Sequence, residues 1–255
     1  CAMYLEKPFR IVPEDEVDNA IEAEDPRGVS KVFLCDGDAM ALPTPRLLRV
    51  LRKVSSHFPD FRRAGIYCWP PNVRRKSDSE LRALREAKLG IAYVGLESGD
   101  DVTLDRVRKG AKADEFVSCV RRLQEAGIKA SVICLLGVGG RDRSREHARA
   151  TADVLNRMQP KFASFLTVTA CEGTPLASSI EKGSFEEVSP MESLQELRWI
   201  VEDLEFKGTI VRANHASSYL PIGGTFPKDK EAVLEALDLA LGGEISLKPE
   251  WMRGL

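Results

Sequence analysis

Residues 91–100, IAYVGLESGD, hold the pattern that decides the fold of this chain. A short apolar run comes first, and a polar turn with two glycines and two carboxylates follows it directly. Short apolar runs of this kind are typical of strands that are buried on both faces of a parallel sheet. Four more such runs occur along the chain, with amphipathic helical patterns between them. They are residues 32–34, 65–68, 130–136 and 162–168.

The helical segments between these runs carry recognisable end signals. A Ser followed by Glu three residues later predicts a capping box, and a Pro in the first turn also marks a helix start. The predicted starts are Thr44 before Pro45, Ser77 with Glu80, Ser144, and Ser189 with Glu192. Alternation of strand and helix with right-handed crossovers leaves a doubly wound sheet or a barrel.

Five such units, with one more expected upstream, predict a partial (β/α)6 TIM-like barrel whose first strand is missing. We assign residues 1–175 to this barrel. Residues 176–255 break the rhythm and are predicted to form a C-terminal helical appendage that packs on the barrel without a core of its own.

The overall charge excludes some classes of protein. The chain has 37 basic and 39 acidic residues, a formal net charge of −2, so no global field attracts it to nucleic acid or membranes. No apolar run has the length of a membrane span. The six cysteines are scattered without a C-x-x-C pair, which disfavours a disulfide framework.

In α/β folds ligands bind at the carboxyl ends of the strands, and several predicted strands end in unusual residues. Asp36, Gly37 and Asp38 follow the first run, where a carboxylate could hold an ammonium group, although Asp and Gly are also ordinary turn residues. Glu97 and Ser98 follow the third run and could bind sugar hydroxyls, while Ser98 and Asp100 could also cap the next helix.

Four further places in the sequence carry candidates of other kinds. The glycine-rich turn 137–140 is a weak signal for an anion site or simply a turn with positive φ. Cys171 could donate a hydrogen atom to a substrate radical, although a structural thiol is the commoner role. His215 lies in a polar loop that could cover the barrel mouth and transfer a proton. Tyr67 and Trp69 could stack on a flat substrate or pack at the strand end.

Several of these stretches resemble one superfamily, in the right order along the chain. Cys1-Ala2-Met3-Tyr4 resembles the end of the C-x3-C-x2-C cluster loop of radical S-adenosylmethionine (radical SAM) enzymes. Residues 95–99 resemble the Gly-x-Glu-Ser-Gly stretch of the elongator-type, methylthiotransferase-type and coproporphyrinogen oxidase-like members. Asp36-Gly37-Asp38 stands where the superfamily has Gly-Gly-Glu, and residues 214–230 resemble the tail of iron–sulfur oxidoreductases of the same superfamily.

This resemblance implies a 4Fe–4S cluster and SAM as cofactors, with reductive cleavage of SAM to a 5′-deoxyadenosyl radical. It also implies a cytoplasmic enzyme served by a one-electron reductant such as flavodoxin or ferredoxin. The sequence itself indicates no membrane or nucleic-acid partner, and it leaves the substrate open. Cys1 would be a cluster ligand, with its two partner cysteines upstream. The implied SAM contacts are the amino group at Asp38, which is favoured over Asp36, beside Gly37, the carboxylate at Lys109, the ribose at Glu97 and Ser98, and the adenine at Leu135, Leu136 and Gly137.

Two other readings of the sequence stay open. A barrel that has lost cluster chemistry could bind SAM as a scaffold module. A conventional barrel enzyme acting on a phosphorylated metabolite would use the turn 137–140 as its anion site.

Overall fold

The computed structural model describes residues 10–253 and contains a seven-stranded sheet whose strands follow the order of the chain. The strands are β1 (Lys31–Leu34), β2 (Arg63–Tyr67), β3 (Leu89–Glu97), β4 (Lys129–Leu136), β5 (Phe162–Thr167), β6 (Thr209–Ala213) and β7 (Ile222–Phe226). The pairs β1–β2, β2–β3, β4–β5 and β5–β6 are parallel, whereas β7 runs antiparallel to β6. All five predicted strands are present, which confirms the predicted α/β class.

The described residues divide into two compact units. The N-terminal unit comprises residues 10–94 and 118–130, and the C-terminal unit comprises residues 95–117 and 131–253. The strands β3 and β4, and the helix α6 (Ala113–Glu125) between them, contribute residues to both units.

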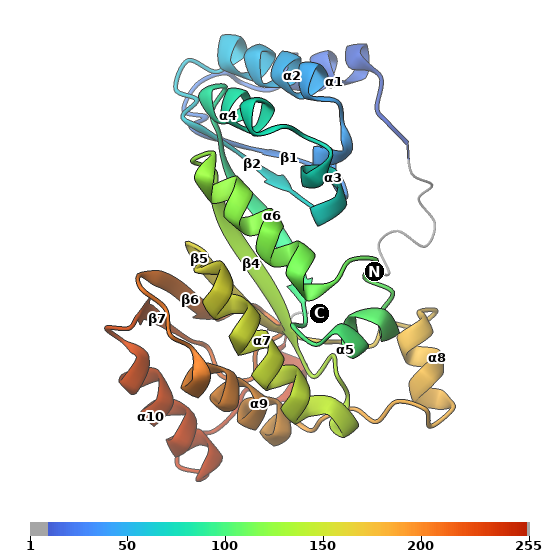
Figure 1. Cartoon of the computed structure of the whole chain (residues 1–255), viewed down its shortest axis with the longest axis vertical. Helices are drawn as coiled ribbons and strands as arrows, with labels where there is room; N and C mark the ends of the chain where they lie inside the picture. The colour runs from blue at the N-terminus through green and yellow to red at the C-terminus, as the bar shows by residue number, and fades with distance from the viewer. Residues whose placement is uncertain (1–9, 254–255) are drawn as a thin grey trace. The chain divides into compact units, whose positions relative to one another are not determined.

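The N-terminal unit packs its helices on β1 and β2. Its helices are α1 (Glu14–Glu22), α2 (Thr44–His57), α3 (Pro70–Arg74) and α4 (Asp78–Glu86), and α2 contacts both α1 and α4 (Figure 1). Leu47 and Leu51 of α2, Leu81 of α4 and Ile66 of β2 are all fully buried. The capping box of Ser77 and Glu80 is confirmed. The predicted N-cap of α2 is wrong by one residue, because Pro43 is the cap and Thr44 is already helical.

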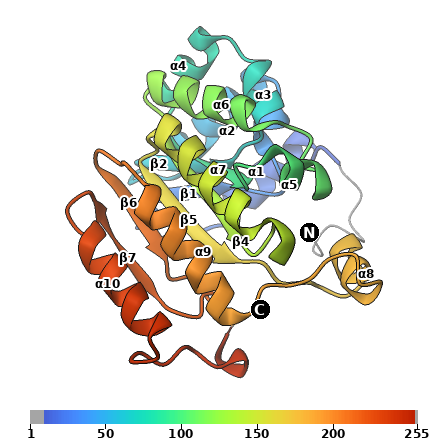
Figure 2. The same ribbon diagram turned by 60° about the horizontal axis from the view of Figure 1, so that its bottom comes forward.

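The C-terminal unit is built from β5–β7 and a layer of helices over them (Figure 2). Helix α7 (Ser144–Met158) packs on α9 (Pro190–Asp203), and α9 packs on α10 (Lys230–Leu241). The remaining helices are α5 (Asp101–Arg106) and α8 (Pro175–Glu181), with short 3-10 turns η2 (Ala39–Ala41), η3 (Arg141–Arg143) and η4 (Glu250–Met252). The predicted start of α7 and the capping box of α9 are confirmed.

The segment after residue 175 contains strands as well as helices. Its β6 pairs with β5 through Phe162 and Ile210, and its α9 lies against α7. The division of the chain at residue 175 stays a prediction.

Candidate functional site

The carboxyl end of β3 holds the most unusual backbone of the C-terminal unit. Glu97 has a φ of 64°, and the Ser98 amide donates to the Leu96 carbonyl at 2.9 Å across it. A hydrogen bond from residue i+2 back to residue i around a residue of positive φ is the rare, strained form of γ-turn. Strain of this kind costs about 1–3 kcal/mol, and it concentrates at functional sites where the surroundings hold it in place.

The Glu97 side chain forms an ion pair with Lys109. The Lys109 ammonium donates to Glu97 Oε1 at 2.8 Å, and the two side chains are 22% and 21% exposed. Lys109 follows α5, where its amide donates to the Leu104 carbonyl. A Cβ at Gly95 would lie 2.5 Å from Glu97 Oε1, so a glycine there lets the carboxylate lie against the strand. The predicted residues Glu97 and Lys109 are therefore brought together.

The turn that follows Glu97 is anchored to α7. Ser98 Oγ lies 2.7 Å from His147 Nδ1, and the Gly99 amide donates to Thr151 Oγ1 at 2.9 Å. A Cβ at Gly99 would lie only 2.3 Å from the Ala150 carbonyl oxygen, so no other residue allows this approach. Ser98 is fully buried and serves as an anchor for the turn. The helix cap that the sequence also allowed is supplied by Asp100, which accepts from the Thr103 amide at the start of α5.

Asp100 is also held by a guanidinium from the start of α7. Arg143 Nε donates to Oδ2 at 2.8 Å and Nη2 donates to Oδ1 at 3.0 Å, a two-pronged pair. Burial by itself would raise the pKa of Asp100, but the hydrogen bonds from Arg143 and Thr103 outweigh it and hold the pKa at about 2. Asp100 is thus a charged, structural residue that stabilises the turn beside Glu97.

The carboxyl end of β4 is tied to α9 by a residue that sequence reasoning missed. Glu196 is fully buried, and its Oε1 accepts the Gly137 amide at 2.6 Å. Ser144 Oγ donates to Oε2 at 2.5 Å, and His147 Nε2 lies 3.4 Å from Oε1. The signal was present, because Glu196 lies four residues before the buried Ile200, on the apolar face of α9.

This contact argues against an anion site in the glycine-rich turn. The Gly137 amide, which would have to donate to a phosphate, instead meets a buried carboxylate, and the Gly140 amide donates to the Gly137 carbonyl. The Leu136 carbonyl is likewise engaged by the Val168 amide. Of the three predicted adenine contacts, Leu135 has a half-buried side chain, whereas Leu136 is buried.

The acidic turn after β1 belongs to the N-terminal unit. Asp38 Oδ2 accepts the Trp69 amide at 3.1 Å and the Asn72 amide group at 2.7 Å, and its Oδ1 accepts the Met40 amide at 3.0 Å. Burial raises the pKa of Asp38, and this effect outweighs the hydrogen bonds, which would lower the pKa. Asp38, which the sequence favoured, is thus fastened to α3 and η2, whereas Asp36 and Gly37 are exposed.

The remaining candidates lie near the ends of β5 and β6 in the C-terminal unit. His215 is exposed, and its Nδ1 accepts the Ser217 amide at 3.1 Å, which leaves the ring proton on Nε2 when the imidazole is neutral. Ser217 Oγ accepts the Thr167 amide at 3.1 Å, so the loop is fixed to the end of β5. Cys171 is exposed and precedes Thr174, which caps α8.

Three aromatic rings form a cluster on β1–β3 in the N-terminal unit. The ring centroids of Phe33 and Tyr67 are 4.8 Å apart, and that of Tyr93 lies 5.3 Å from Phe33. Phe33 and Tyr67 are exposed, which agrees with the predicted stacking surface around Tyr67 without testing it.

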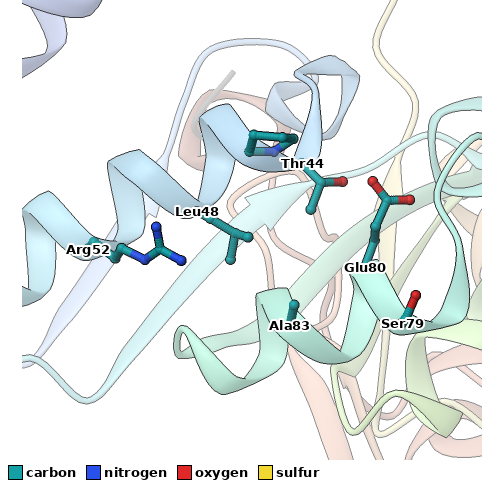
Figure 3. A pocket seen from close by; sticks show the side chains of 7 residues that line it. Thr44, Leu48, Arg52, Ser79, Glu80 and Ala83 are labelled. Carbon is teal, nitrogen blue, oxygen red and sulfur yellow. The ribbon is translucent and has the colours of Figure 1, made fainter.

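A hollow between α2 and α4 is lined by polar and apolar side chains (Figure 3). Thr44 and Glu80 face each other across it, while Leu48 and Ala83 form its floor. Glu80 is already engaged in the capping box of α4. All of the residues that line the hollow belong to α2 and α4, and we assign it no catalytic role.

No cluster of three or more metal-ligating side chains occurs among residues 10–253. The predicted ligand Cys1 lies outside the described residues. Within that described range, none of the helices has the length and apolar character that a membrane crossing requires.

Similarity to known proteins identifies the family. A sequence model of the radical SAM superfamily matches residues 1–155, and the chain therefore belongs to this superfamily, whose members use a 4Fe–4S cluster and SAM. A search of curated protein sequences found no match.

Solved structures of the superfamily share the fold. Coproporphyrinogen III oxidase (HemN) from Escherichia coli is 16% identical with a TM-score of 0.59, over 74% of this chain and 44% of that one. Methylornithine synthase (PylB) is 16% identical with a TM-score of 0.56, over 91% and 73%. Elp3 from the archaeon Methanocaldococcus infernus is 13% identical with a TM-score of 0.56, over 85% and 55%. This similarity confirms the partial TIM-like barrel, and the chain spans about half the length of Elp3 and HemN.

Proposed function

We propose that this chain is the catalytic part of an enzyme that cleaves SAM reductively. When bound, the cluster and SAM supply a 5′-deoxyadenosyl radical that removes a hydrogen atom from the substrate, with methionine as the other product of cleavage. The observation that carries the proposal is the strained turn at Glu97, whose carboxylate is paired with Lys109 at the end of β3.

The side chains at this strand end fit the groups that SAM presents. The Glu97 carboxylate can accept hydrogen bonds from the two ribose hydroxyls, and the Lys109 ammonium can pair with the methionine carboxylate. Both side chains are partly exposed, so a ligand can reach them. Lys109 already lies beside Glu97 and can pair with the carboxylate of a ligand bound there without a large movement. Leu135 would supply apolar contact to the adenine.

The acids after β1 would bind the methionine ammonium, and Cys1 would be a thiolate ligand of the cluster. Asp36 is more exposed to solvent than Asp38, which accepts three hydrogen bonds, and this accessibility favours Asp36 for the ammonium. His215 and Cys171 would act on the substrate side, His215 by proton transfer and Cys171 by hydrogen-atom donation.

A one-electron reductant such as flavodoxin or ferredoxin would serve the cluster, and the cytoplasm would be the site of action. Neighbouring buried cysteines that form no disulfide suit a reducing compartment. The sulfurs of Cys68 and Cys119 lie 3.9 Å apart and are not joined in a disulfide.

The test is anaerobic turnover of the full-length protein. The protein would be reconstituted with iron and sulfide, reduced with dithionite and supplied with SAM, and 5′-deoxyadenosine would be measured. We expect 5′-deoxyadenosine from the native protein and a strong reduction in Glu97→Gln. The matched control is Glu205→Gln, which changes an exposed acid in the same unit.

Two negative results would have different meanings. A protein that binds SAM and holds a reducible cluster but forms no 5′-deoxyadenosine would be the inactive SAM-binding module. A protein that does not bind SAM at all would overturn the proposal.

A further inference from the structure

Glu196 and His147 are completely buried between the ends of two strands of the C-terminal unit. Glu196 comes from α9 and His147 from α7, and these helices lie side by side (Figures 1 and 2). Glu196 receives the Gly137 amide at the end of β4, and His147 contacts Ser98 just after β3. One series of polar contacts therefore connects the two strand ends through the buried acid and imidazole.

The donors and acceptors of this network fit one arrangement of protons. Ser98 Oγ accepts the Asp100 amide at 3.0 Å, so its hydroxyl proton can be donated to His147 Nδ1. The ring proton then lies on Nε2, which forms no hydrogen bond in the described part of the chain and faces Glu196 Oε1 at 3.4 Å. The side chain of Glu196 can be completely buried because the amide of Gly137, the hydroxyl of Ser144 and this ring proton surround its two oxygens.

The network reaches two strand ends that the proposed SAM site uses. Ser98 directly follows Glu97, whose strained turn needs surrounding contacts to hold it. Gly137 is itself one of the three predicted adenine contacts and directly follows the other two, Leu135 and Leu136. Among the described residues, neither Glu196 nor His147 forms a hydrogen bond with Glu97 or Leu135. Their effect on the site would therefore come from fixing the backbone next to Glu97 and Leu135.

We propose that Glu196 and His147 are positioning residues for the nucleoside half of SAM. They fix the ribose-binding turn at Glu97 and the adenine-binding end of β4 relative to each other, and they do so within one unit of the protein. The inference rests on the proposed function, because it takes the two strand ends as the ribose and adenine contacts.

The test measures ligand binding without turnover. Dissociation constants for SAM and for 5′-methylthioadenosine, which retains the nucleoside but lacks the amino-acid part, would be measured by equilibrium dialysis on the reconstituted protein. Glu196→Leu keeps the size of the side chain but leaves the Gly137 amide without an acceptor. We expect this substitution to raise the dissociation constants of both ligands by about tenfold or more, because the hydrogen bond between the Gly137 amide and the Glu196 side chain is lost beside the site.

Two variants separate positioning from simple loss of stability. Glu196→Gln can still accept the Gly137 amide and can donate to Ser144 Oγ, so binding should stay within about threefold of the native protein. Leu197→Ala removes a buried neighbour on the same helix, and it should lower the melting temperature without changing either dissociation constant. His147→Leu should resemble Glu196→Leu.

Each result has a defined meaning. Equal dissociation constants for the native protein and Glu196→Leu, with both folded, would overturn the inference and leave the proposed function intact. The same would follow if Leu197→Ala weakened binding as much as Glu196→Leu. A native protein that binds neither ligand would overturn the proposed function, and the inference with it.

Discussion

Lys109 Nζ lies 2.8 Å from Glu97 Oε1, and this contact joins the strained end of β3 to the turn after α5. Both side chains retain about a fifth of their exposure, so the pair is accessible to a ligand while it stays ordered. An ion pair in this position orients an acceptor and a cation toward the same ligand. We therefore expect the ion pair to contribute more to ligand affinity than to the free energy of unfolding.

We expect Lys109→Met to separate these two effects. Partly exposed ion pairs contribute about 0–1 kcal/mol to stability, so the free energy of unfolding should change little. The affinity for SAM should fall about tenfold or more, because the ligand carboxylate loses its cation. Equilibrium dialysis and urea denaturation would measure the two quantities. 5′-Methylthioadenosine, which has no carboxylate, should bind as it does to the native protein, and a parallel loss for both ligands would contradict the assignment of Lys109.

The two aspartates after β1 should respond differently to substitution. Asp38→Ala removes the acceptor for Met40, Trp69 and Asn72, and we expect the free energy of unfolding to fall by about 1–3 kcal/mol. Asp36→Ala alters an exposed residue and should change stability by less than about 0.5 kcal/mol. Only Asp36→Ala should weaken SAM binding at full stability. If Asp38→Asn kept its stability and lost SAM binding, Asp38 would be the ligand, as the sequence favoured.

The ion pair of Asp100 and Arg143 should make the free energy of unfolding depend on pH in the acid range. The pKa of Asp100 is depressed to about 2, so its contribution is complete above the unfolded-state value near 4 and is lost as the pH falls toward 2. The free energy of unfolding of Asp100→Asn should be about 2 kcal/mol lower than that of the native protein at pH 7. Urea denaturation between pH 7 and pH 2.5 would measure this difference, and we expect it to shrink across the acid range. No difference between the two proteins at pH 7 would show that Asp100 acts as a helix cap, which Asn can replace, rather than as a charge.

Arg253 should hold the loop that carries His215. Its side chain is 3% exposed, its Nε donates to the Ser217 carbonyl at 2.9 Å, and its guanidinium lies 4.0 Å from the Tyr219 ring centroid. Arg253→Ala should leave these groups unpaired and expose residues 214–219 to proteolysis, with a loss of about 1–3 kcal/mol in stability. Limited proteolysis followed by mass spectrometry would locate the cleavage. Cleavage at other loops alone would contradict this role of Arg253.

Much of the fold could be predicted because its strands are short apolar runs and its helices start with local signals. The Ser77 and Ser189 capping boxes depend on residues three positions apart, so the sequence alone specifies them. The missed strand β7 contains Gly223 and Gly224, which disfavour strand in isolation. The close approach of Asp229 and of the Val211 backbone requires those glycines, and both contacts are tertiary.

The sequence singled out Glu97 and Lys109, which the structure brings together, but it did not reveal the residues that support them. Glu97 and Lys109 occur in a recognisable pattern, and their contact follows from it. The supporting residue His147 is buried on α7. Its partners Ser98 and Glu196 are 49 residues away on either side, and no local pattern connects positions so far apart.

The contact between Glu196 and Gly137 has a consequence for how this protein can be shortened or recombined. A chain that ended at residue 175 would still contain every predicted SAM-binding residue. It would nevertheless lack the acceptor for the Gly137 amide and the Ser144 hydroxyl, and His147 would face solvent where α9 had been. Domain exchange among related barrels should therefore succeed only when α7 and α9 come from the same parent sequence. The two helices would have to be inherited together.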